Sequence, residues 1–407
     1  MRRSETLEAK NYDRCHFPVK SCPVLSLSHG AVAHTAGSTE VMKVFRIAIV
    51  PAALIALGTG TVAYGLHQPG VVGDHRAMSS PSAANTVITM SATGDIMMSN
   101  APGNLPPENG AGFFDSVASS LKADLVMGNL EQPLTGDTGA SKCGSPPTPN
   151  CFAFRSPPSY ARHLHDAGFD LVNTANNHTL DYGPVGARNT RAALKSAGVL
   201  ATGKLDEITV TQVKGVRIAV VGFAPYAGLN NLNDLRHSRE IVLSAKRQAD
   251  LVVLQVHMGA EGMDRQHVRP GHEIFLGEDR GDPIAFSHAM IDAGADLIIG
   301  HSPHVLRGMQ FYRGRLIAYS MGNFAGGGKA LSSRGLLKYG GILRVSLEKD
   351  GTYVSGSFLS TQMNSIGLPI RDSANERGRQ LVEQLSADDF GATRPRFGAD
   401  GSIRPQI

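Results

Sequence analysis

The chain of 407 residues contains no tryptophan, and aromatic residues make up only 6% of it. This composition gives no sign of an aromatic platform on which sugar rings could stack. The sequence also has no run of lysine or arginine, and its formal net charge is only +4. This small positive charge gives no reason to expect nucleic-acid binding, although it is compatible with binding of an anionic polymer. With 42% hydrophobic and 18% charged residues, the chain can bury one large core or two modest ones.

Cysteine is scarce as well, with four residues in the whole chain. Two of them, Cys143 and Cys151, lie in the predicted globular part and bracket a proline-rich loop, KCGSPPTPNC. In a chain outside the cytoplasm such a pair suggests a disulfide, worth about 2–3 kcal/mol in the chain-entropy treatment. A cysteine metal pair is the weaker alternative, because no nearby histidine or second cysteine pair completes it. We expect the disulfide to hold the loop between the two cysteines in place as a flap.

The N-terminal region carries the one long apolar run. Residues 44–66 are uncharged after Arg46, follow Lys43, and lead into a polar linker at 67–85. This pattern is typical of a secretory signal or a single membrane anchor. No small-x-small cleavage site lies close to the run, which favours an uncleaved anchor with the domain outside the cell; a buried core helix is the alternative. Met42 looks like the start, so we interpret 1–41 as a non-native extension, 42–66 as the anchor, 86–386 as one domain and 387–407 as a tail.

An acidic residue opens each of four apolar runs, and each run ends on potential metal ligands. The opening residues are Asp124, Asp170, Asp250 and Asp296, and a helix-like stretch precedes each one. That rhythm is typical of an α/β layer protein. Strands side by side present their carboxyl ends at one edge, where ligands collect. A fifth run, VITMSATGD, brings Asp95 to the same edge. The candidate groups at the run ends are Asp95, Asn129, Glu131, Asn177, His178, His257, His301 and His304.

This set of side chains indicates divalent metal binding. Carboxylate, amide and imidazole groups suit Zn, Mn, Fe or Mg, and no thiolate is present to force a softer site. The set is too large for one structural ion and suits two adjacent metals, which can clamp a phosphoryl or carbonyl oxygen and lower the pKa of a bridging water. Taken singly, each residue could instead be a satisfied hydrogen-bond partner.

Six motifs occur in an order that resembles a known family. They are GDIMM (94–98), GNLEQPLT (128–135), the segment 154–183, VHMGAE (256–261), GADLIIGHSPHVLRG (294–308) and SMGNF (320–324). Together, over roughly residues 86–365, they look like the bacterial capsule-synthesis CapA family, the poly-gamma-glutamate capsule proteins. That family is related to the calcineurin-like metallophosphoesterases. The resemblance therefore implies an α/β four-layer metallophosphoesterase-like sandwich, two mixed sheets flanked by helices, with two divalent metals (Mn, Zn or Fe) at the strand ends.

The resemblance also implies roles for particular residues. His178, which follows the motif asparagine, would help to protonate the leaving group. Three departures stand out: Met97 replaces the histidine of the superfamily's DxH motif, Glu131 stands where the superfamily has a bridging aspartate, and the closing pair is spaced HSPH. A thioether is a poor substitute for imidazole with these metals. The implied metal ligands are Asp95, Glu131, Asn177, His257, His301 and His304.

Two classes of function follow. In the first, the protein is a membrane-anchored metallohydrolase that cleaves a phosphoester or gamma-amide bond of an anionic cell-envelope polymer. In the second, it is a non-catalytic component that binds and exports such a polymer, for example poly-gamma-glutamate. The missing histidine favours the second class, and the rest of the constellation favours the first. A single anchor provides no pore, so export would require membrane synthase subunits or another partner.

The remaining predictions concern elements around this edge. We expect helices at 158–168 and 184–198, each with proline near its start and glycine at its end. Hairpins are expected at 208–223, 305–320 and 340–360, around KG, RG and DG turns. The segment 328–340 is either a lid or an exposed connection, and a helix at 371–387 should be the last ordered element.

Four further polar residues have two interpretations each. Asp181 and Asn323 could orient ligands or cap turns. Arg155 and Arg307 could bind a substrate carboxylate or phosphate in bidentate fashion, or be solvated like most loop arginines.

Overall fold

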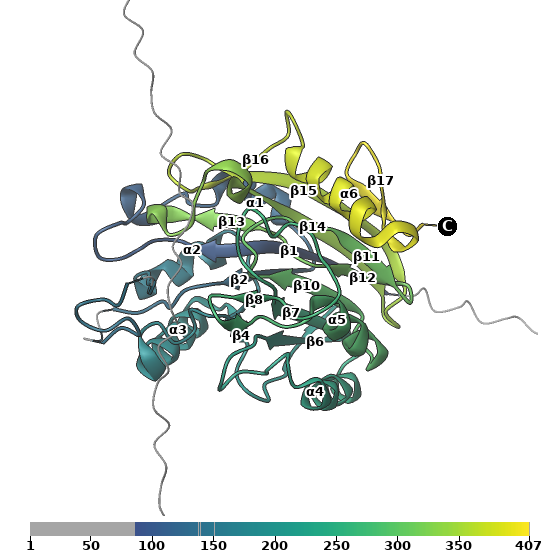
Figure 1. The fold of residues 1–407 in the computed structure, drawn as a ribbon, viewed down its shortest axis with the longest axis horizontal. Helices are drawn as coiled ribbons and strands as arrows, with labels where there is room; N and C mark the ends of the chain where they lie inside the picture. The colour runs from purple at the N-terminus through teal and green to yellow at the C-terminus, as the bar shows by residue number, and fades with distance from the viewer. Residues whose placement is uncertain (1–85, 137, 139, 150, 407) are drawn as a thin grey trace, which may run out of the picture. The chain divides into compact units, whose positions relative to one another are not determined.

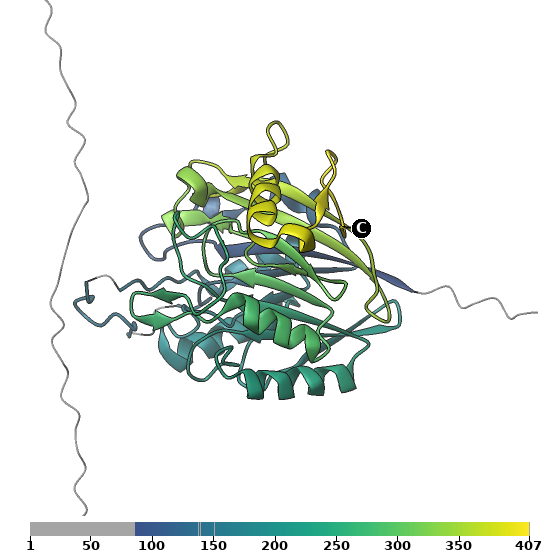
Figure 2. The same ribbon diagram turned by 45° about the vertical axis from the view of Figure 1, so that its right-hand side comes forward.

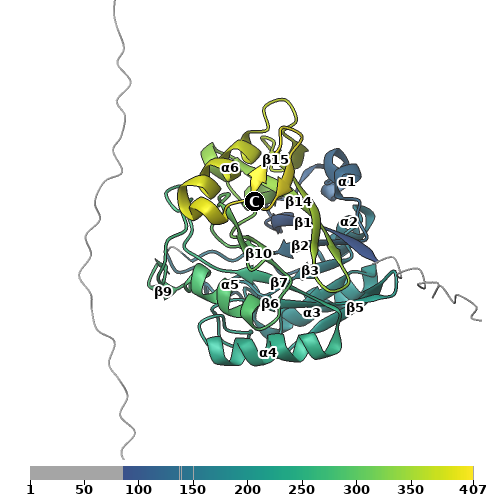
Figure 3. The ribbon, with the colours of Figure 1, turned by 90° about the vertical axis from the view of Figure 1, so that its right-hand side faces the viewer.

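The computed structural model describes residues 86–136, 138, 140–149 and 151–406. In this part, two mixed β-sheets lie face to face, and helices cover both outer faces (Figure 1; Figure 3). The order of strands is β17-β18-β15-β14-β1-β2-β3-β4 in the larger sheet and β11-β12-β10-β7-β6-β5 in the smaller one. The expected α/β sandwich of two sheets flanked by helices is therefore confirmed.

The larger sheet has a parallel half that leads to the predicted ligand edge. Its parallel strands are β1 (Val87–Met97), β2 (Leu125–Leu130), β3 (Leu171–Asn173) and β4 (Leu200–Thr202), with β13 (Asn323–Gly326) parallel to β1. The antiparallel strands are β14 (Tyr339–Glu348), β15 (Tyr353–Met363), β16 (Pro369–Arg371), β17 (Arg396–Phe397) and β18 (Ser402–Arg404). Helices α1 (Asp115–Leu121), α2 (Ala161–Asp166) and α3 (Gly183–Ala197) bury their apolar faces against this sheet.

The smaller sheet repeats the arrangement. Its parallel strands are β6 (Val216–Phe223), β7 (Leu251–His257), β10 (Leu297–His301) and β12 (Arg315–Ala318), with antiparallel β5 (Thr209–Val213) and β11 (Met309–Tyr312) at the two edges. Helices α4 (Leu235–Gln248) and α5 (Pro283–Asp292) pack on its outer face. Figure 2 shows these two helices on the opposite side of the sheets from α6 (Arg377–Phe390), drawn in yellow. A two-stranded hairpin, β8 (Ile274–Phe275) and β9 (Glu278–Asp279), and five short 3-10 helices at 107–110, 158–160, 327–329, 335–338 and 391–393 complete the described elements.

The main core lies between the sheets. Alternate residues of β1, namely Ile88, Met90 and Ala92, pack there against Ile218 and Val220 of β6. Residues of α1, α2 and α3 form a second core outside the larger sheet, and residues of α4 and α5 form a third outside the smaller one. Apolar side chains along the strands thus fill the space between the sheets, and the candidate ligands lie at the carboxyl ends of the strands.

The four acidic residues that open the apolar runs have a structural role. Each accepts a hydrogen bond from the backbone N–H of the neighbouring parallel strand: Asp124 from Thr89 at 2.9 Å, Asp170 from Val126 at 2.7 Å, Asp250 from Arg217 at 2.8 Å and Asp296 from Val252 at 2.9 Å. Each bond gives a hydrogen-bond partner to a backbone N–H at the point where the pairing of two parallel strands begins. It therefore fixes the register of each parallel pair and, with it, which residues reach the far end.

The helices, hairpins and disulfide predicted around the ligand edge are present in the structure. The helices predicted at 158–168 and 184–198 are confirmed as the 3-10 turn at 158–160 followed by α2, and as α3. The three hairpins are confirmed as β5–β6, β11–β12 and β14–β15. The disulfide between Cys143 and Cys151 is present, with 5.5 Å between the two Cα atoms.

The prediction for the C-terminal end was wrong. The last helix, α6, ends at Phe390 and packs against β11, β14 and β15. Strands β17 and β18 follow it and extend the larger sheet beyond β15, with Ile403 buried in the core between the sheets. A strand of three residues is too short to show alternation, so the sequence pattern did not reveal that it covers the sheet edge.

The predicted anchor at 42–66 and the linker at 67–85 lie outside the described residues. Within residues 86–406, apart from the three undescribed positions, no helix is both long and apolar enough to cross a membrane.

The role of the run-opening acids can be tested at Asp296, which is buried and also pairs with Lys246 at 3.0 Å. Asp296→Ala should lower the free energy of unfolding by about 2–3 kcal/mol, because it leaves the buried N–H of Val252 without its side-chain acceptor and removes the ion pair with Lys246, which keeps only the carbonyl oxygen of Asp250. Urea denaturation followed by circular dichroism measures this. The control Asp264→Ala, at an exposed carboxylate, should stay within about 0.5 kcal/mol of the wild type; equal stabilities of the two variants would contradict this role.

Candidate metal centre

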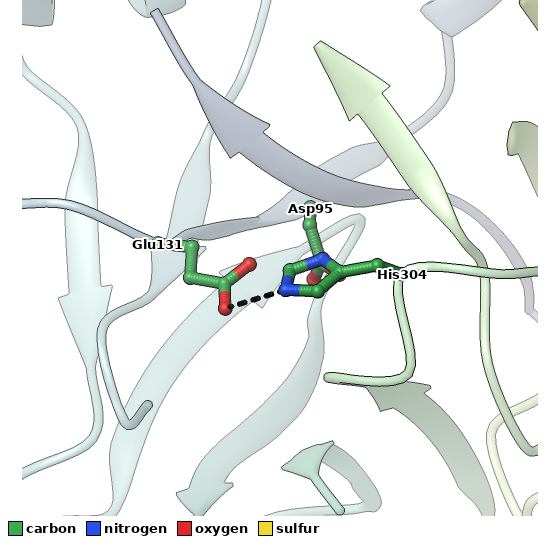
Figure 4. A group of neighbouring side chains, drawn as sticks. All are labelled: Asp95, Glu131 and His304. Atoms are coloured by element: carbon green, nitrogen blue, oxygen red, sulfur yellow. Dashed lines mark ion pairs between the residues drawn. The ribbon is translucent and has the colours of Figure 1, made fainter. Parts of the chain in front are cut away.

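Three side chains, two fully buried and one partly buried, meet at the carboxyl ends of the strands (Figure 4). Asp95 lies near the end of β1, Glu131 directly follows β2, and His304 lies in the loop after β10. The Nδ1 atom of His304 is 3.3 Å from Oδ2 of Asp95, and its Nε2 atom is 3.7 Å from Oε1 of Glu131. One potential ligand atom from each residue lies within 4.8 Å of the others. This spacing suits a cation between them.

An irregularity in β1 directs Asp95 toward the second sheet. Ile88, Met90 and Ala92 face the space between the sheets, so strict alternation would turn residue 95 away from it. The pairing of β1 with β2 shifts between Ala92 and Asp95, and its pairing with β13 shifts directly after Asp95. As a result Ile96 packs in the outer core, and Asp95 faces the histidines of the smaller sheet. Bulges commonly re-aim side chains in this way beside functional sites.

The glycine before Asp95 allows two motifs to touch. The backbone N–H of Asp95 donates to the carbonyl oxygen of Gly322 at 2.9 Å. A Cβ atom placed on Gly94 would lie only 1.9 Å from that same oxygen. The motifs GDIMM and SMGNF can therefore pack together because Gly94 has no side chain. This backbone contact fixes the position of Asp95 relative to the other candidate ligands.

The smaller sheet contributes two further histidines, both fully buried. His257 ends β7, and its Nε2 atom lies 3.8 Å from Oε1 of Glu131. His301 ends β10, and its Nδ1 atom lies 3.5 Å from Oδ1 of Asp95. The other ring nitrogen of His301 shares a hydrogen bond with Gln255, which fixes the orientation of the ring. The structure thus brings together five of the six predicted ligands within a network of close polar distances.

Asn177, the sixth predicted ligand, lies at the rim of this group. Its side-chain nitrogen donates to Glu261 at 3.4 Å, and its side-chain oxygen is buried without a partner. Asn129, a run-end candidate in the sequence, has a different position: it donates to Oδ1 of Asp95 at 2.8 Å and accepts from Asn173 at 3.0 Å. Asn129 therefore orients Asp95 from behind.

Unpartnered buried atoms test whether the group fits a metal ion. Around Asp95 and Glu131, several buried side-chain nitrogen and oxygen atoms have no hydrogen-bond partner within the described residues, and these atoms are potential metal ligands. Burial of polar atoms without hydrogen-bond partners is costly, so their concentration here fits a site for a cation. The chemistry of the donors, carboxylate, imidazole and amide oxygen, suits a divalent ion. These atoms are Oδ2 of Asp95, both oxygens of Glu131, Oδ1 of Asn177, both ring nitrogens of His257 and Nδ1 of His301.

The electrostatics agree with that reading. Burial alone would raise the pKa of Asp95, but the imidazoles of His301 and His304, 3.5 and 3.3 Å from its carboxylate, outweigh it and hold that pKa far below its usual range. Burial, together with the charge of Asp95, raises the pKa of Glu131 well above its usual value. Burial opposes the charge of His304, yet the carboxylates around it, Glu131 foremost, raise its pKa well above normal. Because the pKa values of Glu131 and His304 are both raised, protons would compete with a cation for these two groups.

His178 lines the same cavity as His304 and belongs to a chain of polar contacts with Asp181 and Lys142. Its Nδ1 atom is 2.8 Å from Oδ2 of Asp181, and Lys142 lies 2.7 Å from the other oxygen of that carboxylate. Burial lowers the pKa of His178 despite the opposing influence of Asp181. Lys142 directly precedes Cys143, so the disulfide loop supplies a cation that supports the pair. Asp181 thus orients a histidine, as one of its two interpretations predicted.

A cavity of about 670 Å³ opens onto both His178 and His304. Asn323, through its side-chain oxygen 2.9 Å from Nδ1 of His304, orients that ring. Met97, which stands in the sequence where the resemblance expects a histidine, also lines this cavity. The segment 328–340, predicted as either a lid or an exposed connection, contributes residues 330–332 and 337 to the wall; which of the two it is stays a prediction.

Two charged residues of this cavity were missed by the sequence reasoning. Glu261 lies 3.7 Å from Nε2 of His304 and accepts a hydrogen bond at 2.8 Å from Arg280. Arg280 also contacts Glu278 at 3.0 Å and lies over the ring of Tyr226. Glu261 was visible in VHMGAE, four residues after His257, but no pattern in the sequence marks Arg280.

The two arginines considered for substrate binding have structural contacts. Arg307 is fully buried, donates to both oxygens of Glu273 at 2.8 and 2.7 Å, and donates to the carbonyl of Arg265. It is therefore neither available to a substrate nor solvated, so neither of its two interpretations agrees with the structure. Arg155 is also buried, donates to the carbonyl of Gly136, and lies over the ring of Tyr182.

Comparison with known proteins agrees with the motifs. The family described as bacterial capsule synthesis protein PGA_cap matches residues 89–327, more than half of the chain. The PGA biosynthesis protein CapA of Bacillus subtilis (strain 168) is 32% identical over 260 residues, covering 59% of this chain and 64% of that protein. The capsule biosynthesis protein CapA of Bacillus anthracis is 30% identical over 262 residues, covering 59% and 60%. The chain thus spans less than two thirds of the length of these relatives.

Among solved structures, a putative 5'-nucleotidase from Staphylococcus aureus in complex with alpha-ketoglutarate aligns with a TM-score of 0.40 and 14% identity, covering 74% of this chain and 58% of that one. These values are too low for any property of that protein to be transferred.

The contact between the two glycine motifs gives a prediction. Gly94→Ala should lower the free energy of unfolding by about 1–3 kcal/mol, because its Cβ has to displace the backbone at Gly322. It should also weaken metal binding, since Asp95 moves with that backbone. Urea denaturation and calorimetric titration with Mn²⁺ measure the two effects. The control Gly103→Ala has no atom within 4 Å of its added Cβ; a Gly94→Ala variant that matches this control would refute the assignment.

The pKa shifts predict how metal binding depends on pH. Below their raised pKa values, Glu131 and His304 carry protons that compete with a cation, so apparent affinity should increase with pH by up to about tenfold per unit for each proton displaced. Above those pKa values the increase should stop. Calorimetric titration with Mn²⁺ in buffers of different ionisation enthalpy counts the protons released. Glu131→Gln should give a shallower increase, and an affinity of the wild type that does not vary with pH would rule out the proton competition.

Proposed function

The chain belongs to the bacterial capsule synthesis family PGA_cap, and from that membership we propose that it is a metal-dependent hydrolase acting on an anionic cell-surface polymer. The bond cleaved is a phosphoester or a gamma-amide. The domain acts outside the cytoplasm, held to the membrane by the apolar run at 42–66. The polymer is poly-gamma-glutamate or another capsule component, and membrane synthase subunits are its expected partners.

One observation supports the hydrolase more than any other. The described residues concentrate their unpartnered buried ligand atoms at the point where Asp95, Glu131 and His304 meet. A purely structural polar cluster would satisfy these atoms with each other. The residues that would hold a divalent cation are Asp95, Glu131, Asn177, His257, His301 and His304.

The chain's own groups supply the rest of the chemistry. A cation bound there would polarise a phosphoryl or carbonyl oxygen and lower the pKa of a water. Asp181 accepts from Nδ1 of His178, which leaves Nε2 as the nitrogen that can exchange a proton with a substrate. Because burial disfavours the charged ring, a proton that reaches Nε2 is readily given up to a leaving group.

The setting outside the cell is supported by the disulfide, since such bonds persist in oxidising compartments. The relatives named above are capsule biosynthesis proteins, which supports an anionic surface polymer as the substrate.

A second candidate rests on Met97. This residue lines the cavity and stands in the sequence where the resemblance expects a histidine. Loss of one imidazole ligand lowers the affinity for a metal ion that would bind there. The alternative is a non-catalytic component that binds and transports the same polymer, with a vestigial metal site.

The role of His178 separates the two candidates. With Mn²⁺ present, His178→Ala should reduce hydrolysis of a generic phosphodiester or of γ-linked glutamate oligomers about 10²- to 10⁴-fold, because a positioned acid is lost. Metal content should not change. Release of nitrophenol or of new amino groups measures the rate, and His165→Ala, at an exposed ring on α2, is the matched control. A metal-loaded wild type without turnover on either substrate would instead favour the transport component.

A further inference from the structure

A second cavity, of about 440 Å³, lies at the same edge of the larger sheet. Its wall includes Thr174, Thr179 and Leu180, which flank the residues Asn177 and His178 that line the metal cavity. The segment 174–180 therefore separates the two cavities and forms a wall of each. Whatever occupies the second cavity lies beside the segment that carries His178.

The walls of this cavity are mostly apolar. Leu130 and Pro133 come from the end of β2 and the loop after it, Leu180 from the loop after β3, and Leu229 from the loop after β6. The volume is that of an ordinary small-molecule site. An inorganic anion would leave most of this apolar surface uncovered, so the shape favours a ligand with aliphatic groups.

The polar part of the lining is positively charged. Arg188 and Arg191 lie three residues apart on α3 and so share one face of the helix. Lys204 approaches from the loop after β4. No aspartate or glutamate is among the described residues that line the cavity.

The three cations differ in how far they are neutralised. Arg191 pairs with Glu207 and donates to the carbonyl of Ala201, while its Nη1 atom is buried without a partner. The side chains of Arg188 and Lys204 have no polar partner among residues 86–406 as far as they are described. The cavity thus offers two unpaired cations, from α3 and from the loop after β4, around an apolar floor.

We infer that this cavity binds a short stretch of a chain that carries carboxylates on an aliphatic backbone. Arg188 and Lys204 would pair with successive carboxylates, and Leu180 and Leu229 would cover the methylene groups between them. The inference rests on the proposed function for the identity of the chain as part of the surface polymer. It adds a binding site for that polymer outside the metal cavity, positioned against the segment of His178.

The experiment is a calorimetric titration of the full chain, in buffer with EDTA, with a short oligomer of γ-linked glutamate. Arg188→Ala/Lys204→Ala should bind the oligomer about tenfold more weakly than the wild type, because two exposed ion pairs are lost. Lys122→Ala/Lys195→Ala removes the same charge from exposed positions outside the cavity and should bind like the wild type. Ala187→Phe, which fills the cavity from α3, should also weaken binding.

Three outcomes would overturn the inference. They are equal affinities of the two double variants, wild-type affinity of Ala187→Phe, and free glutamate binding as tightly as the oligomer, which would indicate a site for a small anion. The buffer contains EDTA, so binding here does not depend on the metal centre. A protein without metal or turnover that still shows the expected pattern would contradict the hydrolase and leave this site standing.

Discussion

The structure depends on the burial of two carboxylates, Asp95 and Glu131, between two sheets. Each side chain is fully buried, and a buried carboxylate without compensation costs several kcal/mol. His304 compensates part of this charge, and Asn129 donates one hydrogen bond to Asp95. The atoms that stay unpartnered are the ones a divalent cation would bind. The bulge in β1, the contact of Gly94 with Gly322 and the two strand-end histidines all hold this arrangement, and the donor atoms that it brings together suit a divalent cation.

The two ends of the parallel strands have separate tasks. At the amino ends, Asp124, Asp170, Asp250 and Asp296 bind backbone N–H groups of neighbouring strands and fix their register. At the carboxyl ends, the same register places ligand atoms from both sheets within a few ångströms. Because a shift of one residue would turn every side chain to the opposite face, the acids that begin the strands are a condition for the site at their other end. The repeated acidic pattern therefore has a structural cause, and the convergence of the candidate ligands at the other end of the strands is its consequence.

Much of this arrangement could be predicted from the sequence, and the failures have physical reasons. The hairpins and α3 follow from local turn and capping signals, and the convergence of Asp95, Glu131 and the histidines follows from the parallel topology. Arg307 was misjudged because its partner Glu273 lies 34 residues away, in a loop whose path no periodicity reveals. Arg280 was missed for the same reason. The role of Asn129 could not be separated from that of a ligand, because both require a polar residue at a strand end, and β18 was too short to show alternation.

The metal content of the purified full chain tests the central claim most directly. Elemental analysis should find about two transition-metal ions per chain after incubation with Mn²⁺ or Zn²⁺, and clearly fewer in His257→Ala, because both ring nitrogens of the histidine at the end of β7 are buried without a hydrogen-bond partner. The control is His288→Ala, since this histidine lies on α5 and bonds to Gln310; it should bind as much metal as the wild type. A wild-type chain that binds no metal, or a His257→Ala variant that binds as much as the wild type, would contradict the account.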